Sequence, residues 1–329
     1  MPLDLFRSRR PTSWHNWRVT GPSTSVTFDD RSATLDRVLR SILRVATVAM
    51  GATVPLLSER LDDVSDAVRP VSTVALWATW AVVLFGVLVP SATSLTAVRL
   101  VAPIHLLVTA VLVIGHLGDD STALVVLALV PTLVVNLVSA TAEIGIWFVQ
   151  TSAYGDERRV LLRAPLTFVV VQIVAWAVWV ASTVIGVVSL AHEDWIVGGV
   201  LVVVGIVLTV ILPRRFHRLA RRWLVFVPAG VVVHDHVVLA ETAMFDRSAV
   251  GSISITERSS DAADLSGRCG GTGVEIELTD FDTVVLAATP RRPGGSALHV
   301  KTLWVRPTRP GRAVSAWNSR AARSRSPRR

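Results

Sequence analysis

Four polar side chains interrupt apolar stretches of the sequence and could carry chemistry there. His105, Asn136, Glu143 and Gln172 stand in or at the ends of runs of Val, Leu, Ile and Ala. A polar group inside a lipid bilayer is costly, and it usually faces the interior of a helix bundle or a water-filled path. His105 could therefore relay a proton or contact a ligand. The alternative for His105 and Gln172 is structural, as a hydrogen bond or a packing contact between helices.

Asn136 and Glu143 are the pair whose spacing is most suggestive. They are seven residues apart, so on one continuous helix they share a face and could line a polar cavity. Pro131 precedes them and predicts a kink that frees backbone groups. The alternative is a hydrogen bond from Asn136 to a neighbouring helix and an interfacial Glu143, paired with Arg158 or Arg159.

The sequence shows no catalytic cluster, metal centre or cofactor motif. His234 and His236 alternate on a predicted strand and would point to one face, but a zinc site needs further ligands. The run GRCGGTG at 267–273 lacks the ending of a phosphate-binding loop. Cys269 is the only cysteine, which excludes an intramolecular disulfide. We therefore expect no catalytic residue, no metal and no cofactor.

Basic clusters are the most specific signal in the chain. The run RRFHRLARR at 214–222 holds five arginines, and the last part of the chain, from Arg306, holds eight arginines and no acid. Such clusters attract anionic lipid with about 1 kcal/mol per residue near the surface. The alternatives are enforcement of topology by the first cluster and a solvated end for the second. We expect membrane lipids, and no nucleic acid, as partners; the candidate lipid-facing residues are Arg214, Arg215, Arg218, Arg221 and Arg222.

Apolar runs long enough to cross a bilayer fill the middle of the chain. A spanning helix needs about 20 predominantly apolar residues. A sixth run at 42–57 is weaker, because it is short and contains Arg44. The sequence therefore predicts a transmembrane domain over 41–213, with spans at about 42–57, 71–90, 97–117, 121–140, 166–190 and 195–212.

The distribution of arginine predicts the orientation. Cytoplasmic loops are enriched in Lys and Arg. Gly118–Asp120 and Ala191–Asp194 each hold two acids and no Lys or Arg, whereas Thr151–Ala164 and the run at 214–222 are basic. The first two segments are thus predicted outside and the last two inside.

The predicted orientation bears on whether the weak run at 42–57 crosses the membrane. The Arg-rich N-terminal segment 1–40 belongs in the cytoplasm only if 42–57 crosses. Six spans with both ends cytoplasmic, in the plasma membrane, are therefore favoured. Five spans with an amphipathic N-terminal helix are the alternative, with the N-terminal segment outside.

The chain beyond the last span predicts a separate cytoplasmic β domain over 214–312. A terminal helix and basic tail follow over 313–329. The stretch GVEIELTDFDTVVLAA alternates in polarity and predicts a hairpin turning at Asp280–Asp282. Short strands are expected at Val237–Met244, Val250–Ile255, Val274–Leu278, Thr283–Ala287 and His299–Val305.

The segments RRWLVFVPAGVVVHD, MFDRSAVGSISI and GVEIELTDFDTVVLAA, followed by the terminal helix, carry a resemblance. In this order they resemble bacterial PH-like domains on multi-pass membrane proteins, and the whole chain resembles uncharacterised actinobacterial integral membrane proteins. The resemblance implies a small β-barrel closed by a helix, an all-β or α+β fold, attached to an α-helical polytopic membrane domain.

Three functions are compatible with these features. The leading one is a non-enzymatic membrane scaffold or accessory protein whose PH-like domain docks on a protein partner or on the anionic inner leaflet. A transporter of a small solute or ion, using the polar residues of the helix bundle, is the second. A membrane-embedded enzyme is the third, and no catalytic motif supports it.

Overall fold

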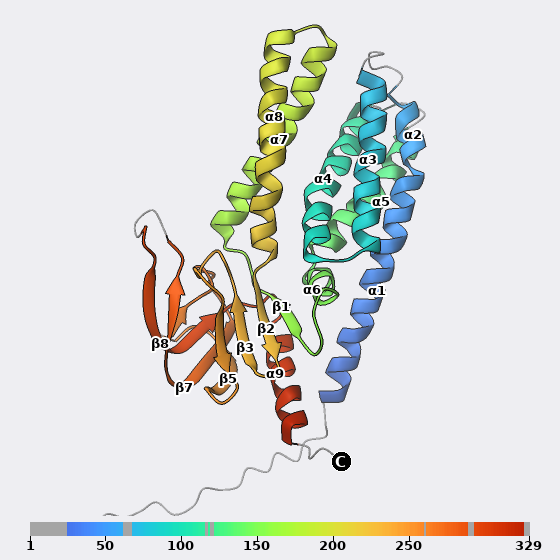
Figure 1. Cartoon of the computed structure of the whole chain (residues 1–329). Coiled ribbons are helices and arrows are strands. Elements are labelled where there is room, and N and C mark those ends of the chain that lie inside the picture. The colour runs from blue at the N-terminus through green and yellow to red at the C-terminus, as the bar shows by residue number, and fades with distance from the viewer. Residues whose placement is uncertain are drawn as a thin grey trace, which may run out of the picture.

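The computed structural model describes residues 25–61, 68–115, 118, 122–259, 261–288 and 293–325. Within them, six helices are long and apolar enough to cross a membrane, above a β-containing C-terminal part (Figure 1). The chain therefore has a helical membrane part and a β-containing part. Most of the predicted N-terminal segment, most of the loop at 116–121 and the end of the basic tail lie outside the described residues.

The helices form a bundle of four with a hairpin beside it. The weak predicted span at 42–57 is an apolar helical segment formed by α1 (Ser25–Ala52) and α2 (Val54–Glu59). Helix α4 contacts α3 and α5 in the bundle, and it contacts α8 of the hairpin. The remaining long helices are α3 (Val68–Leu88), α4 (Ala92–Gly115), α5 (Thr122–Ala140), α7 (Leu166–Ala191) and α8 (Trp195–Ala220).

The hairpin of α7 and α8 is held by close contact at glycines. A Cβ atom on Gly186 would lie 2.8 Å from the backbone nitrogen of Val202, so only a residue without a side chain allows this approach. Small residues let membrane helices pack backbone to backbone. The Trp179 indole adds a hydrogen bond of 2.8 Å to the Thr209 hydroxyl.

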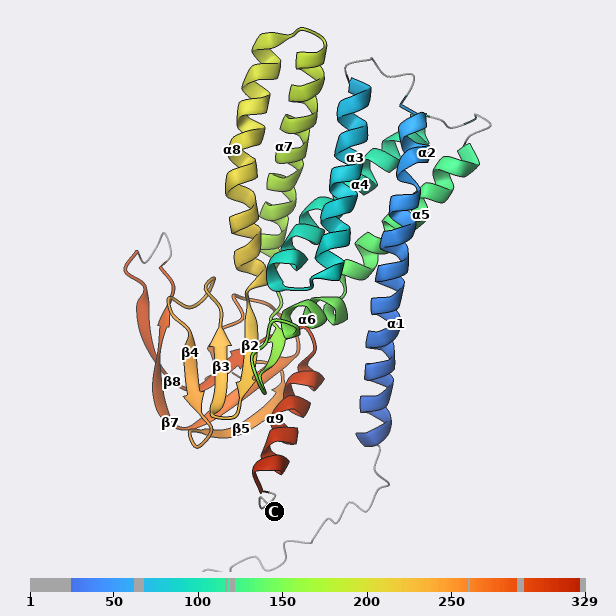
Figure 2. The same cartoon turned by 45° about the vertical axis from the view of Figure 1, so that its right-hand side comes forward.

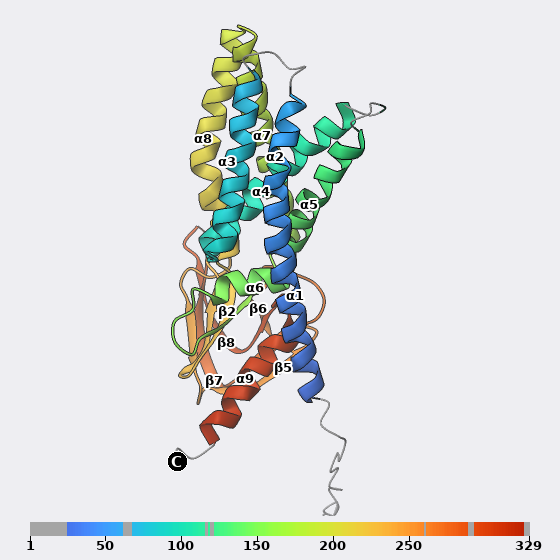
Figure 3. The same cartoon turned by 90° about the vertical axis from the view of Figure 1, so that its right-hand side faces the viewer.

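Helix α5 does not continue to Glu143, so the prediction that Asn136 and Glu143 share one helix face is wrong. The backbone of Thr141 is extended, and its hydroxyl caps the N–H of Ile144. The short helix α6 (Ala142–Gln150) then runs across the base of the bundle (Figure 3). The Arg99 guanidinium stabilises the break by donating to the carbonyl of Ser139 at 3.0 Å and of Thr141 at 3.4 Å.

The C-terminal part contains two four-stranded sheets. The first has the order β1-β2-β3-β4, and all its neighbours are antiparallel. The second has the order β5-β7-β8-β6, with β6 parallel to β8. The strands are β1 (Arg158–Leu161), β2 (Trp223–Val227), β3 (Gly230–His234), β4 (Ala243–Asp246), β5 (Val250–Thr256), β6 (Ala263–Asp264), β7 (Gly273–Leu286) and β8 (Ser296–Val305).

Strand β1 was not predicted, and two strand predictions need correction. β1 comes from the basic linker between α6 and α7, and it pairs with β2. The hairpin predicted at 280–282 does not form, because β7 continues through it and pairs with β8 on both sides of an irregularity between Glu277 and Asp282. The strand predicted at 237–244 is mostly a turn, since the Asp235 carboxylate accepts from the N–H of Val237. Only Ala243 and Met244 belong to a strand, and Leu239 forms an isolated bridge to Leu286.

The last helix, α9 (Pro310–Arg325), closes the β part. It contacts β5, β7, β1 and β2, and Trp317 packs 6.4 Å from the ring of Phe226. The described beginning of α1 and the end of α9 both lie on the side of the helix bundle that carries the sheets (Figures 1 and 2).

Candidate functional site

Strand β2 is buried on both of its faces, and this defines how the β part meets the membrane helices. Leu224 and Phe226 point into the core between the two sheets, and both are fully buried. Trp223 and Val225 point the other way and join a second core with residues of α1 and α6. A strand buried on two faces is typical of the middle of a fold, not of a domain on a flexible linker.

Two ion pairs fasten α9 to the membrane helices beside this strand. Glu143 of α6 accepts from Arg309, with Oε1 2.6 Å from Nη2, and its side chain is only 6% exposed. Arg312 donates through both terminal nitrogens to Asp36 of α1, at 2.8 and 3.1 Å. We call β2, α6, α9 and these two ion pairs the joint.

The partner predicted for Glu143 is therefore wrong. Arg159 pairs with Glu157 at 2.7 Å instead. The turn at Thr141 is the reason, because it directs α6 away from the line of α5 and towards the start of α9. Charges 166 residues apart meet in this way, and nothing local in the sequence could have paired them.

The other polar residues of the helices bind neighbouring helices and do not form one site. His105 is fully buried on α4, and its Nδ1 lies 3.1 Å from the Thr79 hydroxyl of α3. Asn136 donates to the carbonyls of Ala102 and Thr132, at 3.2 and 2.9 Å. Gln172 is half-buried on α7.

Arg222 is not lipid-facing, which corrects its assignment from the sequence. Its side chain is fully buried and donates to Asp235 through Nε at 2.9 Å and Nη2 at 2.7 Å. It also donates to the carbonyls of Arg163 and Ser266. The hairpin register pairs Trp223 with His234, so the next residues outward are Arg222 and Asp235. Opposite charges equidistant from the predicted turn were the signal that could have revealed this pair.

The remaining four arginines of the cluster are exposed on the last turns of α8 and just beyond it. Arg214, Arg215, Arg218 and Arg221 lie between the apolar part of α8 and the start of β2. Among the residues that the structure describes, no carboxylate forms an ion pair with them. We call these four residues the α8 arginines.

His234, at the end of β3, and His236 lie close together. Their rings are 4.4 Å apart in an edge-on arrangement, and His234 also stacks on Trp223. Over the described ranges, no group of three or more His, Cys, Asp or Glu side chains is placed to hold a metal ion. Burial lowers the pKa of His234 to about 4, and the positive charges of His236, Arg221 and Arg159 act in the same direction, while Asp235 opposes them.

The depressed pKa of His234 predicts a loss of stability in acid. An unfolded histidine takes up its proton near pH 6.5, whereas His234 in the folded protein resists protonation down to about pH 4. The unfolded state therefore binds more protons as the pH falls from about 6.5 to 4, and folding weakens across that window. Thermal unfolding at pH 7 and pH 5 should show a smaller decrease in Tm for His234→Gln than for the unmodified protein. An equal decrease in Tm in the variant and in the unmodified protein would contradict the assignment of this acid sensitivity to His234.

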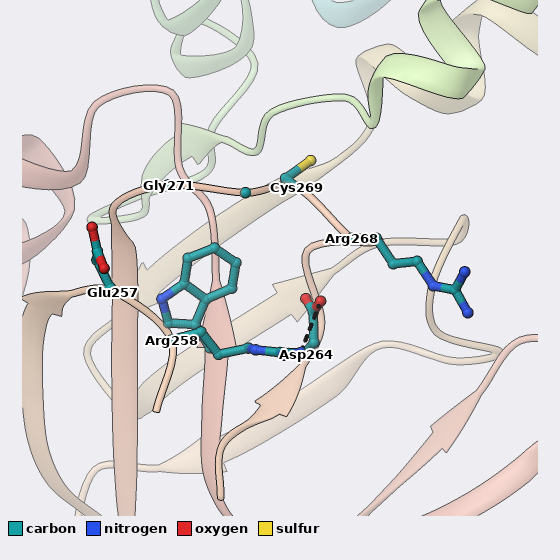
Figure 4. Close-up of a pocket in the computed structure, with 8 residues that line it drawn as sticks. Glu257, Arg258, Asp264, Arg268, Cys269 and Gly271 are labelled. Atoms are coloured by element: carbon teal, nitrogen blue, oxygen red, sulfur yellow. Dashed lines mark hydrogen bonds and ion pairs between the residues drawn. The ribbon is translucent and has the colours of Figure 1, made fainter. Parts of the chain in front are cut away.

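An open pocket of about 530 Å³ lies on the β part (Figure 4). Its wall includes residues of the GRCGGTG run, whose sequence lacks the ending of a phosphate-binding loop. Trp304 lines it, and Arg258 and Asp264, which also line it, form an ion pair at 3.4 Å. The lining residues are Glu257, Arg258, Asp264, Arg268, Cys269, Gly270, Gly271 and Trp304.

Comparison of the chain with protein-family models, curated proteins and solved structures gave no match. The joint, the α8 arginines and the pocket are the features of this chain that bear on its function.

Proposed function

We propose that this protein is a non-enzymatic membrane scaffold that holds its β domain in a fixed position against the anionic inner leaflet of the plasma membrane. The burial of β2 on both faces carries the proposal, because it makes the β domain an extension of the helix bundle. A domain fixed in this way offers a partner or a lipid surface one orientation only.

The α8 arginines support docking on anionic lipid. They follow the apolar part of α8 directly, so they lie at the depth of the lipid headgroups when α8 spans the bilayer. Long arginine side chains place their charge at that interface. Each exposed arginine near the surface of an anionic leaflet contributes about 1 kcal/mol.

The PH-like character of the β domain belongs to the same proposal. Two four-stranded sheets enclose a core, and α9 packs against strands of both sheets. This arrangement supports the resemblance to PH-like domains on multi-pass membrane proteins. In that reading the domain is a docking module, with no reaction to catalyse.

The proposed orientation predicts how Cys269 reacts in intact cells. Cys269 is the only cysteine and lies on the β domain, so it reports the side on which that domain lies. A maleimide that cannot cross membranes should label it only after the cells are permeabilised. Labelling in sealed cells would place the β domain outside and contradict the proposal.

Removing charge from the α8 arginines should weaken the preference for anionic lipid. For Arg214→Gln/Arg218→Gln we expect a loss of about 25-fold in phosphatidylglycerol binding, from about 1 kcal/mol per arginine. Native mass spectrometry of the detergent-purified full chain, with phosphatidylglycerol against phosphatidylcholine, measures this. Arg37→Gln/Lys301→Gln removes the same charge from exposed positions elsewhere and should have little effect. Equal losses in both double variants would contradict a specific role.

A further inference from the structure

The pocket of the β domain lies next to the residues that begin a membrane helix. The sulfur of Cys269 lies 3.7 Å from the carbonyl oxygen of Arg163. A Cβ atom on Gly267 would lie 2.8 Å from the ring of Pro165, the residue that caps the start of α7. Figure 4 shows the loop of Cys269 directly below the segment that leads into this helix. The pocket is therefore at the level where the β domain meets the membrane.

Arginines surround this pocket. Arg258 lies within it, and its side chain is 51% exposed. Arg268 is exposed and extends outward from the loop. The guanidinium of Arg306 lies against Gly271, where a Cβ atom would come within 2.9 Å of Nη2. Arg163 is also exposed, and its N–H donates to the carbonyl of Arg306 at 2.8 Å.

The acids of the pocket cancel only part of these charges, and one of them, Asp264, pairs with Arg258 through Oδ2 at 3.4 Å. Asp264 is occupied in holding the loop, because its Oδ1 accepts from the N–H and the hydroxyl of Ser266, at 2.8 and 2.6 Å. The Ser266 hydroxyl in turn accepts from the N–H of Cys269. Asp264 and Glu257 thus stand against the guanidinium groups of Arg258, Arg268 and Arg306, and one positive charge is left over.

Two glycines of the loop add backbone N–H donors to which an anion can bind. Among the described residues, no acceptor takes the backbone N–H of Gly270 or Gly271. Both glycines line the pocket, and Gly271 has a φ of 93°, a conformation that favours glycine. Exposed N–H groups and guanidinium groups together are the usual partners of a phosphate group.

We propose that this pocket binds the phosphate-bearing headgroup of an anionic phospholipid of the inner leaflet. The proposal rests on the proposed function, because only docking on that leaflet brings a headgroup to the pocket. The volume of about 530 Å³ falls within the usual range for small-ligand sites. The position beside α7 favours a headgroup that is anchored in the bilayer over a soluble phosphate ester.

The reactivity of Cys269, the single cysteine, at the edge of the pocket reports whether the pocket is occupied. The full-length protein is placed in nanodiscs of phosphatidylcholine, with or without phosphatidylglycerol, and the rate at which a maleimide labels Cys269 is measured. The ratio of the two rates is compared within each variant, so that changes in intrinsic thiol reactivity cancel. Two arginines at about 1 kcal/mol each favour binding of phosphatidylglycerol about 25-fold, so phosphatidylglycerol should slow labelling by at least about fivefold.

Three double variants distinguish binding of the headgroup in the pocket from a general attraction of the protein to the membrane. In Arg258→Gln/Arg268→Gln the rate ratio should return to near one, whereas Arg37→Gln/Lys301→Gln should keep the ratio of the unmodified protein. In Arg214→Gln/Arg218→Gln, the overall lipid preference falls but protection of Cys269 persists at high phosphatidylglycerol. The same ratio in all variants would overturn the pocket and leave the proposed function standing.

A soluble anion tests whether the phosphate group that the pocket binds belongs to a lipid or to a free phosphate compound. Inorganic phosphate or glycerol phosphate, added to nanodiscs of phosphatidylcholine alone, should give no protection at millimolar concentration. Protection as strong as that from phosphatidylglycerol would overturn the assignment to lipid. A Gly271→Ala variant provides a check within the loop, because its Cβ would press on Arg306, and it should also lose protection.

Discussion

Replacing Asp235 with asparagine should lower the free energy of unfolding of the β domain by about 3–5 kcal/mol. The variant leaves the Arg222 guanidinium charged and fully buried, with its carboxylate partner gone. The carbonyls of Arg163 and Ser266 still accept from it, but they do not balance its charge. Because Ser266 belongs to the loop of the pocket, the pocket should also loosen.

Hydrogen exchange of the amides in β2 and β3 measures this loss strand by strand. Arg221→Gln is the matched control, since it removes an exposed charge next to Arg222 and should change protection by less than about 0.5 kcal/mol. Replacing both partners, as in Arg222→Met/Asp235→Leu, should recover much of the loss, because no charge is then buried alone. Unchanged exchange in Asp235→Asn would show that the pair does not hold the sheet.

Reversing the charge of Glu143 should separate α9 from the membrane helices. In Glu143→Arg, a second guanidinium stands opposite Arg309 at a position where the native side chain is only 6% exposed. Loss of a buried partner costs about 3–5 kcal/mol, but Arg309 is 47% exposed, so screening by water reduces this to about 2 kcal/mol. The expected result is faster exchange over 310–320 with little change in β7.

A charge swap provides the decisive control for this prediction. Arg309→Glu alone should also weaken the joint, and Glu143→Arg/Arg309→Glu should restore protection of α9. Asp36→Asn should have a smaller effect, because the Asp36 side chain is more exposed than that of Glu143, at 23% against 6%. If the swap were no better than either single change, direct pairing of Glu143 with Arg309 would be contradicted.

The features of the fold that could be predicted from the sequence are those that depend on local composition. Length and apolarity gave the long helices, and the arginine distribution favoured the crossing of the weak run that contains Arg44, which the structure forms as an apolar helix. The terminal helix and most strands also follow from alternation of polar and apolar residues. The exposed position of Arg214, Arg215, Arg218 and Arg221 agrees with their place in a basic run after an apolar one.

What the sequence did not predict depends on residues far apart in the chain. The sequence of β2, WLVFV, is typical of an ordinary buried strand. No residue in it indicates that the two faces of the strand meet two different cores. Asp280 and Asp282 suggested a turn, but β8 is long enough to pair with both halves of β7. The pocket needed the end of β5, strand β6, the loop of Cys269 and Trp304 of β8 to be placed together, which no local motif indicates.

The rigidity of the joint is the central claim, and the distance between two spin labels tests it most directly. One label is attached to Cys269, and the second to a cysteine that replaces Val89, an exposed residue just after α3. In nanodiscs, double electron–electron resonance should give one narrow distance distribution that is the same with and without phosphatidylglycerol. Glu143→Arg should broaden it. A broad or multiple distribution in the unmodified joint would show a β domain that swings beneath the membrane and would contradict the account.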